Sequence, residues 1–455
     1  MTIERDTLTI GLDRITAEER NPETFFEMAN KIRDIDFLIK NNPEDKFKRI
    51  IINESCLDIE PLQTINLLSD ALLINGIIEI DKTKKTDRID EASSFRYDWA
   101  SVSRVGELLG YEGLHSCDST QGPRCIKKAT DIGFRFEYVK ENDFNELSEL
   151  FARAFGTSLT QELFEWKYGN EKGHGLVARD NSGKLVGHYG FIKRVARIKG
   201  ESKIAYQVCD VMTDPSAGAS LKKHQLFGIL ATLFQILIIN DSKYSSIIGY
   251  GFPNQRAMRL AEKLCLYQKV DTIYEATWSK RKKNWLTAWP CRAEPLKAHP
   301  DWPFKIKTLL QKMHEELKDK TMVERSQEYL INRYMEHPCN IYHGYLVFSI
   351  FGIRPVGLFW LKSDSSSLKL VEIICCQKYH NAVIQAARHI AKWKLYSSLQ
   401  MTAWCASSQA NLYRSSGAEV EETDIFIPIN SAVRTISPEA INESWWLSMG
   451  DTDFI

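Results

Sequence analysis

The stretch from residue 206 to residue 266 alternates between strand and helix patterns, and its polar residues gather where the elements meet. Apolar residues at every second position favour strands, whereas spacings of three and four favour helices. The pattern predicts, in order, a strand ending before Asp214, a helix over 226–237, a strand over 245–250 and a helix opening at Asn254. A chain with this alternation folds as an α/β protein.

The segment between the first strand and the first helix carries two adjacent cations, Lys222 and Lys223. Free backbone amides at a helix N-terminus favour an anion, and neighbouring cations strengthen that preference. The segment therefore predicts a pyrophosphate site for a phosphorylated carrier. A solvated helix start is the alternative.

Residues 134–280 resemble the GNAT superfamily of acyl-CoA N-acyltransferases. Three further pieces are similar to a subgroup associated with the biosynthesis of cell-surface carbohydrate, such as lipopolysaccharide or capsule. These pieces are residues 164–168 (FEWKY), 210–215 (DVMTDP) and 251–254 (GFPN). The resemblance implies acyl-CoA as co-substrate and a small-molecule primary amine as acceptor, the amino group of a nucleotide-linked amino sugar.

The resemblance also implies which residues hold the co-substrate. In the superfamily the strand before the turn is bulged and splayed, so its exposed backbone pairs with the pantetheine amides. Asn254 can cap its helix and present an amide to pantetheine. The superfamily turn RxxGxG has Lys222, Gln225 and Phe227 here, without either glycine. The implied co-substrate residues are Val211, Met212, Thr213, Lys222, Lys223, His224, Gln225, Leu226, Phe227 and Asn254.

A second departure from the superfamily concerns the general acid. Its members often carry NxxAxxxYxxxGF, in which the tyrosine protonates the departing thiolate, whereas this chain has Ala261 at the tyrosine position. A thiol has a pKa near about 8.5, so a thiolate leaves readily near neutral pH without an acid. Direct attack by a neutral amine is the mechanism that we expect.

Two residues are candidates for catalysis. Asp210 lies on the strand that faces the acceptor in the superfamily and would orient or deprotonate the amine; a carboxylate capping a local turn is the alternative. His188 is the better base by its intrinsic pKa, and a hydrogen-bonded structural histidine is the alternative. Aromatic faces suit sugars and nucleobases, although core packing is equally compatible with such residues. The candidate acceptor-binding residues are Trp166, Lys167, Tyr168 and Tyr189.

Composition sets limits on the function. The 455 residues contain 59 basic and 59 acidic side chains, so global charge predicts neither a nucleic-acid nor a membrane partner. The N-terminus has no apolar signal core, and no stretch of the sequence is apolar enough to span a bilayer. Ten cysteines occur without paired zinc spacing, so we expect no metal site and a reducing, cytoplasmic location.

Three segments are expected. Residues 1–132, with strands over 49–53 and 76–80, resemble the C-terminal half of a class I methyltransferase in a degenerate form. Residues 133–292 form the GNAT domain with the acyl-CoA site. Residues 293–455 look like a second, divergent GNAT-like domain. The predicted fold class is α/β, with tandem GNAT-like mixed-sheet domains preceded by a smaller α/β domain.

The predicted function is N-acyl transfer from acyl-CoA to a primary amine. Aminoacyl transfer of the peptidoglycan-bridge type is an alternative, because those proteins also carry tandem GNAT-like domains. A noncatalytic scaffold that keeps the fold is the other alternative, because both turn glycines and the tyrosine are missing.

Overall fold

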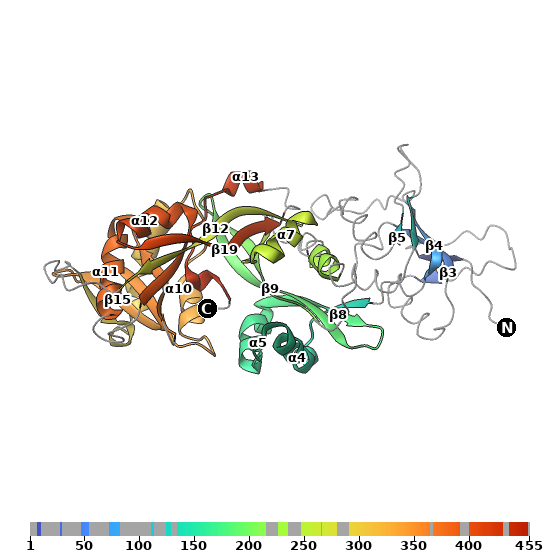
Figure 1. Ribbon diagram of the computed structural model, residues 1–455, viewed down its shortest axis with the longest axis horizontal. Helices are drawn as coiled ribbons and strands as arrows, with labels where there is room; N and C mark the ends of the chain where they lie inside the picture. The colour runs from blue at the N-terminus through green and yellow to red at the C-terminus, as the bar shows by residue number, and fades with distance from the viewer. Residues whose placement is uncertain are drawn as a thin grey trace. The chain divides into compact units, whose positions relative to one another are not determined.

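The computed structural model describes residues 134–214, 226–234, 247–264, 266–279, 291–364, 367–391, 400–430 and 436–453, and of residues 1–133 only the strands (Figure 1). The chain divides into two compact units. Unit 1 comprises Met1–Leu159, His174–Gly190 and Asp210–Lys243, and unit 2 comprises Thr160–Gly173, Phe191–Cys209 and Tyr244–Ile455. No helix among the described residues is long and apolar enough to cross a bilayer.

The first strands of unit 1 form a six-stranded sheet with the order β2-β1-β3-β4-β6-β5. Its pairs from β2 to β4 are parallel, and β6 pairs antiparallel with both β4 and β5. The strands are β1 (Thr7–Ile10), β2 (Met28–Ala29), β3 (Phe47–Asn53), β4 (Leu72–Asp81), β5 (Tyr111–Glu112) and β6 (Arg124–Lys128). The strands expected over 49–53 and 76–80 are confirmed, and the methyltransferase resemblance stays a prediction.

The described remainder of unit 1 places helices against a short antiparallel sheet. Here β7 (Phe134–Tyr138) pairs with β8 (Gly173–Asp180), which is followed by the start of β9 (Leu185–Ile198). The helix over 226–234 packs on β9 at Gly187, where an added Cβ would lie 3.1 Å from the side chains of Leu226 and Leu230. The helices are α4 (Phe144–Phe155) and the one over 226–234. The glycine therefore permits close contact between helix and strand.

The end of β10 (Glu201–Thr213) is fixed in unit 1 by Asp214. The Asp214 amide donates to the Val186 carbonyl at 2.8 Å, and its buried carboxylate forms ion pairs with Arg153 at 3.3 Å and Lys184 at 3.1 Å. Two cations offset the desolvation of one carboxylate. The strand end expected from the sequence is therefore a defined anchor.

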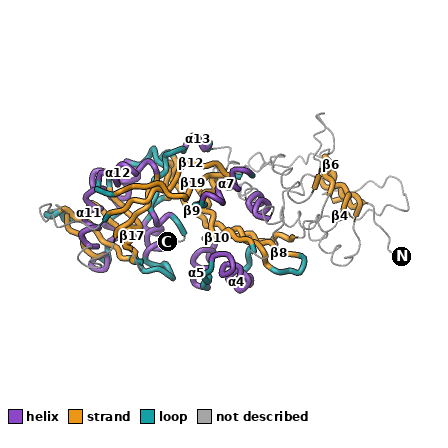
Figure 2. Tube along the Cα trace, in the orientation of Figure 1, coloured by secondary structure: helices purple, strands orange, loops and turns teal. Residues whose placement is uncertain are grey.

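Unit 2 is built on a mixed sheet with helices on its faces (Figure 2). Its strand order is β13-β15-β16-β17-β18-β12-β19-β11-β10-β9, and β14 pairs with β9. The strands not yet bounded are β11 (Ile247–Tyr250), β12 (Tyr267–Trp278), β13 (Cys291–Pro295), β14 (Thr321–Val323), β15 (His343–Ser349), β16 (Pro355–Ser363), β17 (Ser367–Cys375), β18 (Gln400–Ala406) and β19 (Glu419–Asn430). The helices are α5 (Gln161–Tyr168), α7 (Gln255–Lys263), α8 (Trp302–Lys305), α9 (Lys307–Glu316), α10 (Gln327–Tyr334), α11 (His380–Ile390), α12 (Ala410–Ser415) and α13 (Pro438–Ile441). This mixed sheet confirms the predicted α/β class.

The two expected GNAT-like segments exchange their last strands inside unit 2. β12, from the middle segment, lies between β18 and β19 and pairs antiparallel with both. β19, from the last segment, also pairs with β11 of the middle segment. Figure 1 shows β12 and β19 side by side. Neither segment therefore completes its sheet alone, and the boundary expected at residues 292/293 stays a prediction.

The C-terminal segment, residues 445–453, is buried in unit 2. Trp445 and Trp446 belong to the apolar core, so they are not exposed for stacking on a ligand. Arg325, itself fully buried, binds the carboxylates of Asp451 at 2.7 Å and Glu372 at 3.2 Å. Ser448 donates to Glu372 at 3.1 Å. One cation thus joins the C-terminal segment to β17.

Replacing Arg325 with Met should lower the free energy of unfolding by about 3–5 kcal/mol, because two buried carboxylates lose their cation. Urea unfolding of the full chain measures this change. Lys318→Met is the matched control: its ion pair with Glu315 is exposed, so it should cost less than about 1 kcal/mol. Equal stability of the two variants would contradict the role of Arg325.

Candidate functional site

The end of β10 has an irregular backbone at Asp210. Its φ of 48° lies in the left-handed region, which a residue other than glycine rarely adopts inside a strand. A left-handed residue inside a strand distorts the strand locally, as the first residue of some β-bulges does. The distortion falls on a catalytic candidate, and the bulge expected for the strand before the turn stays a prediction.

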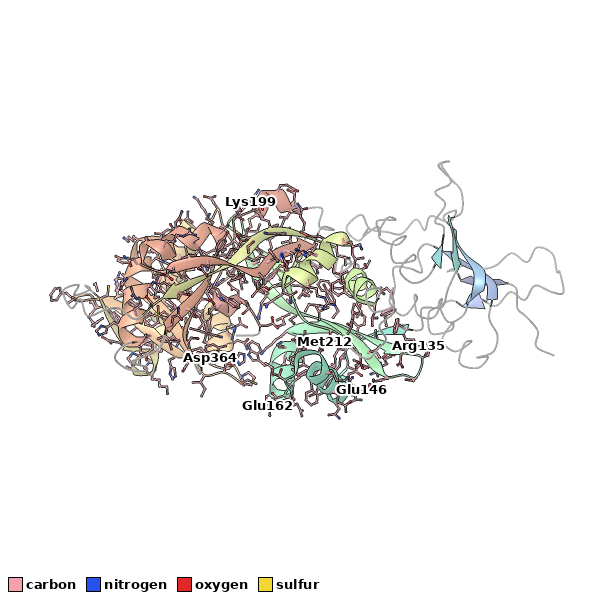
Figure 3. The ribbon with its side chains drawn as sticks, in the orientation of Figure 1. Arg135, Glu146, Glu162, Lys199, Met212 and Asp364 are labelled. Atoms are coloured by element: carbon pink, nitrogen blue, oxygen red, sulfur yellow. The ribbon has the colours of Figure 1, made fainter. Side chains whose placement is uncertain are left out.

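The pairing of β10 with β11 stops before this residue. The parallel pair extends from Ile204↔Ile247 to Gln207↔Tyr250, where β11 ends, whereas β10 continues to Thr213. Val211, Met212 and Thr213 therefore lie beyond the end of β11. Met212, labelled in Figure 3, lies on this part of β10. Backbone groups beyond the end of a neighbouring strand need another partner, which a ligand amide can provide.

His188 contacts Asp210 from the neighbouring strand. Its Nδ1 lies 2.7 Å from the Asp210 carbonyl oxygen, which can only accept, so Nδ1 carries the proton. The ring is almost completely buried and lies against Gly175, where an added Cβ would be 2.6 Å from Nε2. This geometry makes His188 a support for the left-handed backbone, and its role as a base stays a prediction.

The expected co-substrate residues fall into two groups. Lys222, Lys223, His224 and Gln225 lie outside the described residues. Of those described, Leu226 is buried, Phe227 lies 6.3 Å from the Tyr189 ring between centroids, and Asn254 caps α7 by accepting from the Ala257 amide at 3.0 Å. The capping role of Asn254 is therefore observed, whereas its contact with pantetheine stays a prediction.

The α5 residues expected to bind the acceptor lie at the end of that helix in unit 2. Trp166 donates from Nε1 to the Asn332 carbonyl at 3.1 Å, and Lys167 forms a buried ion pair with Asp453 at 3.0 Å. The Tyr168 hydroxyl lies 3.5 Å from Cys209 Sγ on β10. Tyr168 is partly buried, so it is the most accessible of the three beside β10.

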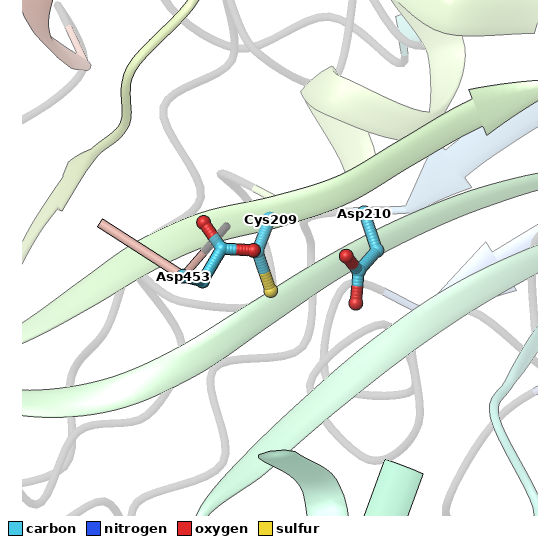
Figure 4. Close-up of side chains that lie close together, drawn as sticks. All are labelled: Cys209, Asp210 and Asp453. Atoms are coloured by element: carbon cyan, nitrogen blue, oxygen red, sulfur yellow. The ribbon is translucent and has the colours of Figure 1, made fainter. Parts of the chain in front are cut away.

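A polar cluster that the sequence did not predict surrounds Cys209 in unit 2. Arg194 donates to Gln207 at 3.1 Å, and Gln207 in turn donates to Asp453 at 3.3 Å. A carboxylate oxygen of Asp453 lies within 4.8 Å of the Cys209 sulfur, and Figure 4 shows both side chains together with Asp210, the next residue on β10. Gln207 was a signal for this cluster, because it is a polar residue between the apolar neighbours Tyr206 and Val208.

The last segment contains a second strand that continues past its parallel partner's pairing. The parallel pair of β17 and β18 ends at Lys369↔Thr402, and β17 continues over 370–375, just as β10 continues over 208–213. Here the short 3-10 helix Met449–Asp451 lies against both β17 and β18. Met449 packs in the same apolar cluster as Val371 of β17. The chain's own C-terminal segment therefore fills the second opening.

Both continuing strands carry a carboxylate three residues beyond their last parallel pair. Asp210 is the third residue beyond the last pair of β10, and Glu372 is the third beyond that of β17. Glu372 is fully buried with Arg325, and burial raises its pKa. Tyr334 donates to the same carboxylate at 3.1 Å. The second carboxylate is thus occupied by internal partners.

Comparison with known proteins identifies residues 135–236 as similar to the acetyltransferase (GNAT) domain. No curated protein sequence matches the chain significantly. A solved structure of a conserved protein of unknown function from Enterococcus faecalis, described as a probable N-acyltransferase, is 12% identical with a TM-score of 0.50, over 68% of this chain and 74% of that one.

Two further solved structures are similar at lower scores. A GCN5-related N-acetyltransferase from Anabaena variabilis is 14% identical with a TM-score of 0.46, over 65% of this chain and 72% of its own. One from Kribbella flavida is 11% identical with a TM-score of 0.46, over 66% and 71%. At these identities the Enterococcus structure supports the fold alone. The domain match confirms the expected GNAT domain and enzyme class, an acyl-CoA-dependent N-acyltransferase.

A pH dependence follows from His337, whose ring packs 4.6 Å from Trp166 between centroids. Burial, with nearby Arg333, lowers the pKa of His337 to about 3, so the folded protein keeps it neutral. The unfolded chain binds a proton near pH 6.5, so this residue makes stability fall as pH drops from about 6.5 toward 3.

His337→Asn should remove this contribution, because an amide oxygen can replace Nδ1 as acceptor for the Cys339 and Asn340 amides without titrating. The difference in unfolding free energy between wild type and variant should change by up to about 1.4 kcal/mol per pH unit in that window. Urea unfolding at a series of pH values measures it. Parallel curves would show that His337 titrates alike in both states.

Proposed function

We propose that the chain transfers an acyl group from acyl-CoA to the primary amine of a nucleotide-linked amino sugar. The observation that carries the acyl-CoA part is the left-handed backbone at Asp210 together with the continuation of β10 past the end of β11. The amino sugar is proposed from the resemblance of residues 164–168, 210–215 and 251–254 to the surface-carbohydrate subgroup.

The co-substrate is assigned to β10 and the turn that follows it. The backbone of Val211, Met212 and Thr213 would pair with the pantetheine amides, because this part of β10 continues past the end of β11. Lys222 and Lys223 would hold the pyrophosphate with the start of the helix that includes Leu226.

Chemistry then proceeds by direct attack. The neutral amine nitrogen forms a bond to the thioester carbonyl carbon, the C–S bond breaks, and the amine proton passes to solvent while CoA leaves as thiolate. Ala261, at the position of the superfamily tyrosine, is buried on α7 and has no proton to give. Orientation of the two substrates supplies most of the rate in such a site.

We expect one acyl-CoA site per chain. The second opening, between β17 and β18, is filled by Met449–Asp451 and by the Arg325–Glu372 pair. Calorimetric titration with acetyl-CoA should therefore give one site per chain. A noncatalytic scaffold would give no heat and no thermal shift. For an aminoacyl transferase of the peptidoglycan-bridge type, turnover would require aminoacyl-tRNA.

The test of the amino-sugar proposal is mass spectrometry. The full chain is incubated with a panel of acyl-CoAs and nucleotide-linked amino sugars, and a mass gain on the sugar supports the assignment. Binding of acyl-CoA without transfer to any sugar in the panel would contradict the proposed acceptor but not the proposed co-substrate.

Replacing Lys222 and Lys223 with Ala should weaken acyl-CoA binding by about tenfold or more while the unfolding midpoint stays unchanged, because exposed charges contribute little to stability. The Michaelis constant for acyl-CoA reports the effect. Lys312→Ala with Lys318→Ala, which removes two charges from α9 and the turn after it, is the matched control. Unchanged affinity in the folded double variant would place the pyrophosphate elsewhere.

Substitutions of Asp210 can distinguish the role of its backbone conformation from the role of its carboxylate. Asn and Gly both tolerate the left-handed conformation, so Asp210→Asn and Asp210→Gly should keep this backbone and measurable turnover. Asp210→Val should lose most turnover, because a β-branched residue strains that backbone.

His188→Ala should likewise keep measurable turnover, at a loss smaller than the hundred- to ten-thousandfold typical of a removed base. Wild-type rate should rise with pH to a plateau set by the substrate amine. Loss of all turnover in Asp210→Asn or His188→Ala, with both substrates still bound, would make that residue the base and exclude unassisted attack.

A further inference from the structure

The hairpin that joins β15 to β16 carries apolar side chains at its tip. Ile350 is 47% exposed, Phe351 98% and Ile353 89%. Single exposed apolar residues are common on protein surfaces, but three within four consecutive positions form a patch. Nothing in the acyl-transfer proposal uses this hairpin.

The tip has a fixed backbone. The Gly352 amide donates to the Ser349 carbonyl at 3.0 Å, which closes the turn. Arg292, on the adjacent strand β13, donates from Nη1 to the carbonyls of Ser349 at 3.2 Å and Ile350 at 2.9 Å. The apolar side chains are therefore presented by a braced turn, and their exposure follows from its shape.

An exposed cation borders the apolar tip. Arg354 follows Ile353 directly and is exposed. The Arg292 guanidinium is held by Glu294 at 2.6 Å and by the two turn carbonyls, so it belongs to the brace of the turn.

We propose that residues 350–354 form a contact with the surface of an anionic lipid bilayer. Phe351 and Ile353 would enter the interfacial region, and Arg354 would face the headgroups. An apolar tip bordered by an exposed cation matches a bilayer, which is apolar below and anionic above. A protein partner would need a concave apolar pocket for a protruding tip of this kind.

The test is co-sedimentation of the full chain with vesicles of phosphatidylcholine alone and of phosphatidylcholine mixed with phosphatidylglycerol. The wild type should bind the mixed vesicles, and added salt should weaken binding because it screens the exposed cation. Phe351→Ser with Ile353→Ser should lower the partition coefficient by at least about tenfold, since burying each such side chain is worth about that factor.

The matched control is Phe304→Ser with Ile341→Ser. These residues are 80% and 78% exposed but lie on α8 and in the loop between α10 and β15. The control should bind as the wild type does. No binding of the wild type to anionic vesicles, or equal binding by the hairpin variant, overturns the proposal. The proposal is also overturned if the wild type is a dimer in solution and the hairpin variant is a monomer, because the tip would then join two copies of the chain.

Discussion

A strand that continues past its parallel partner leaves backbone hydrogen-bonding groups that need new partners, and the described part of the chain contains two such strands. β10 continues past the end of β11, and β17 continues past its last pair with β18 at Lys369. The second opening is closed by the 3-10 helix Met449–Asp451. The two halves therefore share one architectural feature, and the chain itself fills the second, so the proposal places acyl-CoA at the first.

The C-terminal segment determines this difference through buried charge. Arg325 binds Asp451 and Glu372, and Arg333 donates to the carbonyls of Gly450 at 2.8 Å and Thr452 at 3.1 Å. Such a network is costly to desolvate but sets one arrangement when all its members are paired. The same segment ends with Asp453 beside Lys167 and Gln207. One segment thus fills one opening and adds a carboxylate next to Cys209.

The elements were predictable because they depend on local periodicity. The strand expected over 245–250 was confirmed over Ile247–Tyr250, and the helix opening at Asn254 and the two strands expected near the N-terminus were confirmed as well. The exchange of β12 and β19 was not predictable, because pairing between strands distant in sequence leaves no local pattern. The pairing of Asp453 with Lys167 was missed for the same reason.

Asp210 shows where prediction from sequence ends. A resemblance placed a bulge on β10, but the residue with the left-handed backbone, Asp210, is known only from its φ. Aspartate tolerates that conformation better than most residues, so a residue read as catalytic also has a conformational reason to be there. His188 has the same ambiguity, since its Nδ1 supports the Asp210 carbonyl. Glu372 occupies the position in β17 that Asp210 occupies in β10. Its carboxylate is buried against Arg325, so a carboxylate at this position can be wholly structural. Charge at position 210 must therefore be separated from backbone shape before it is assigned to catalysis.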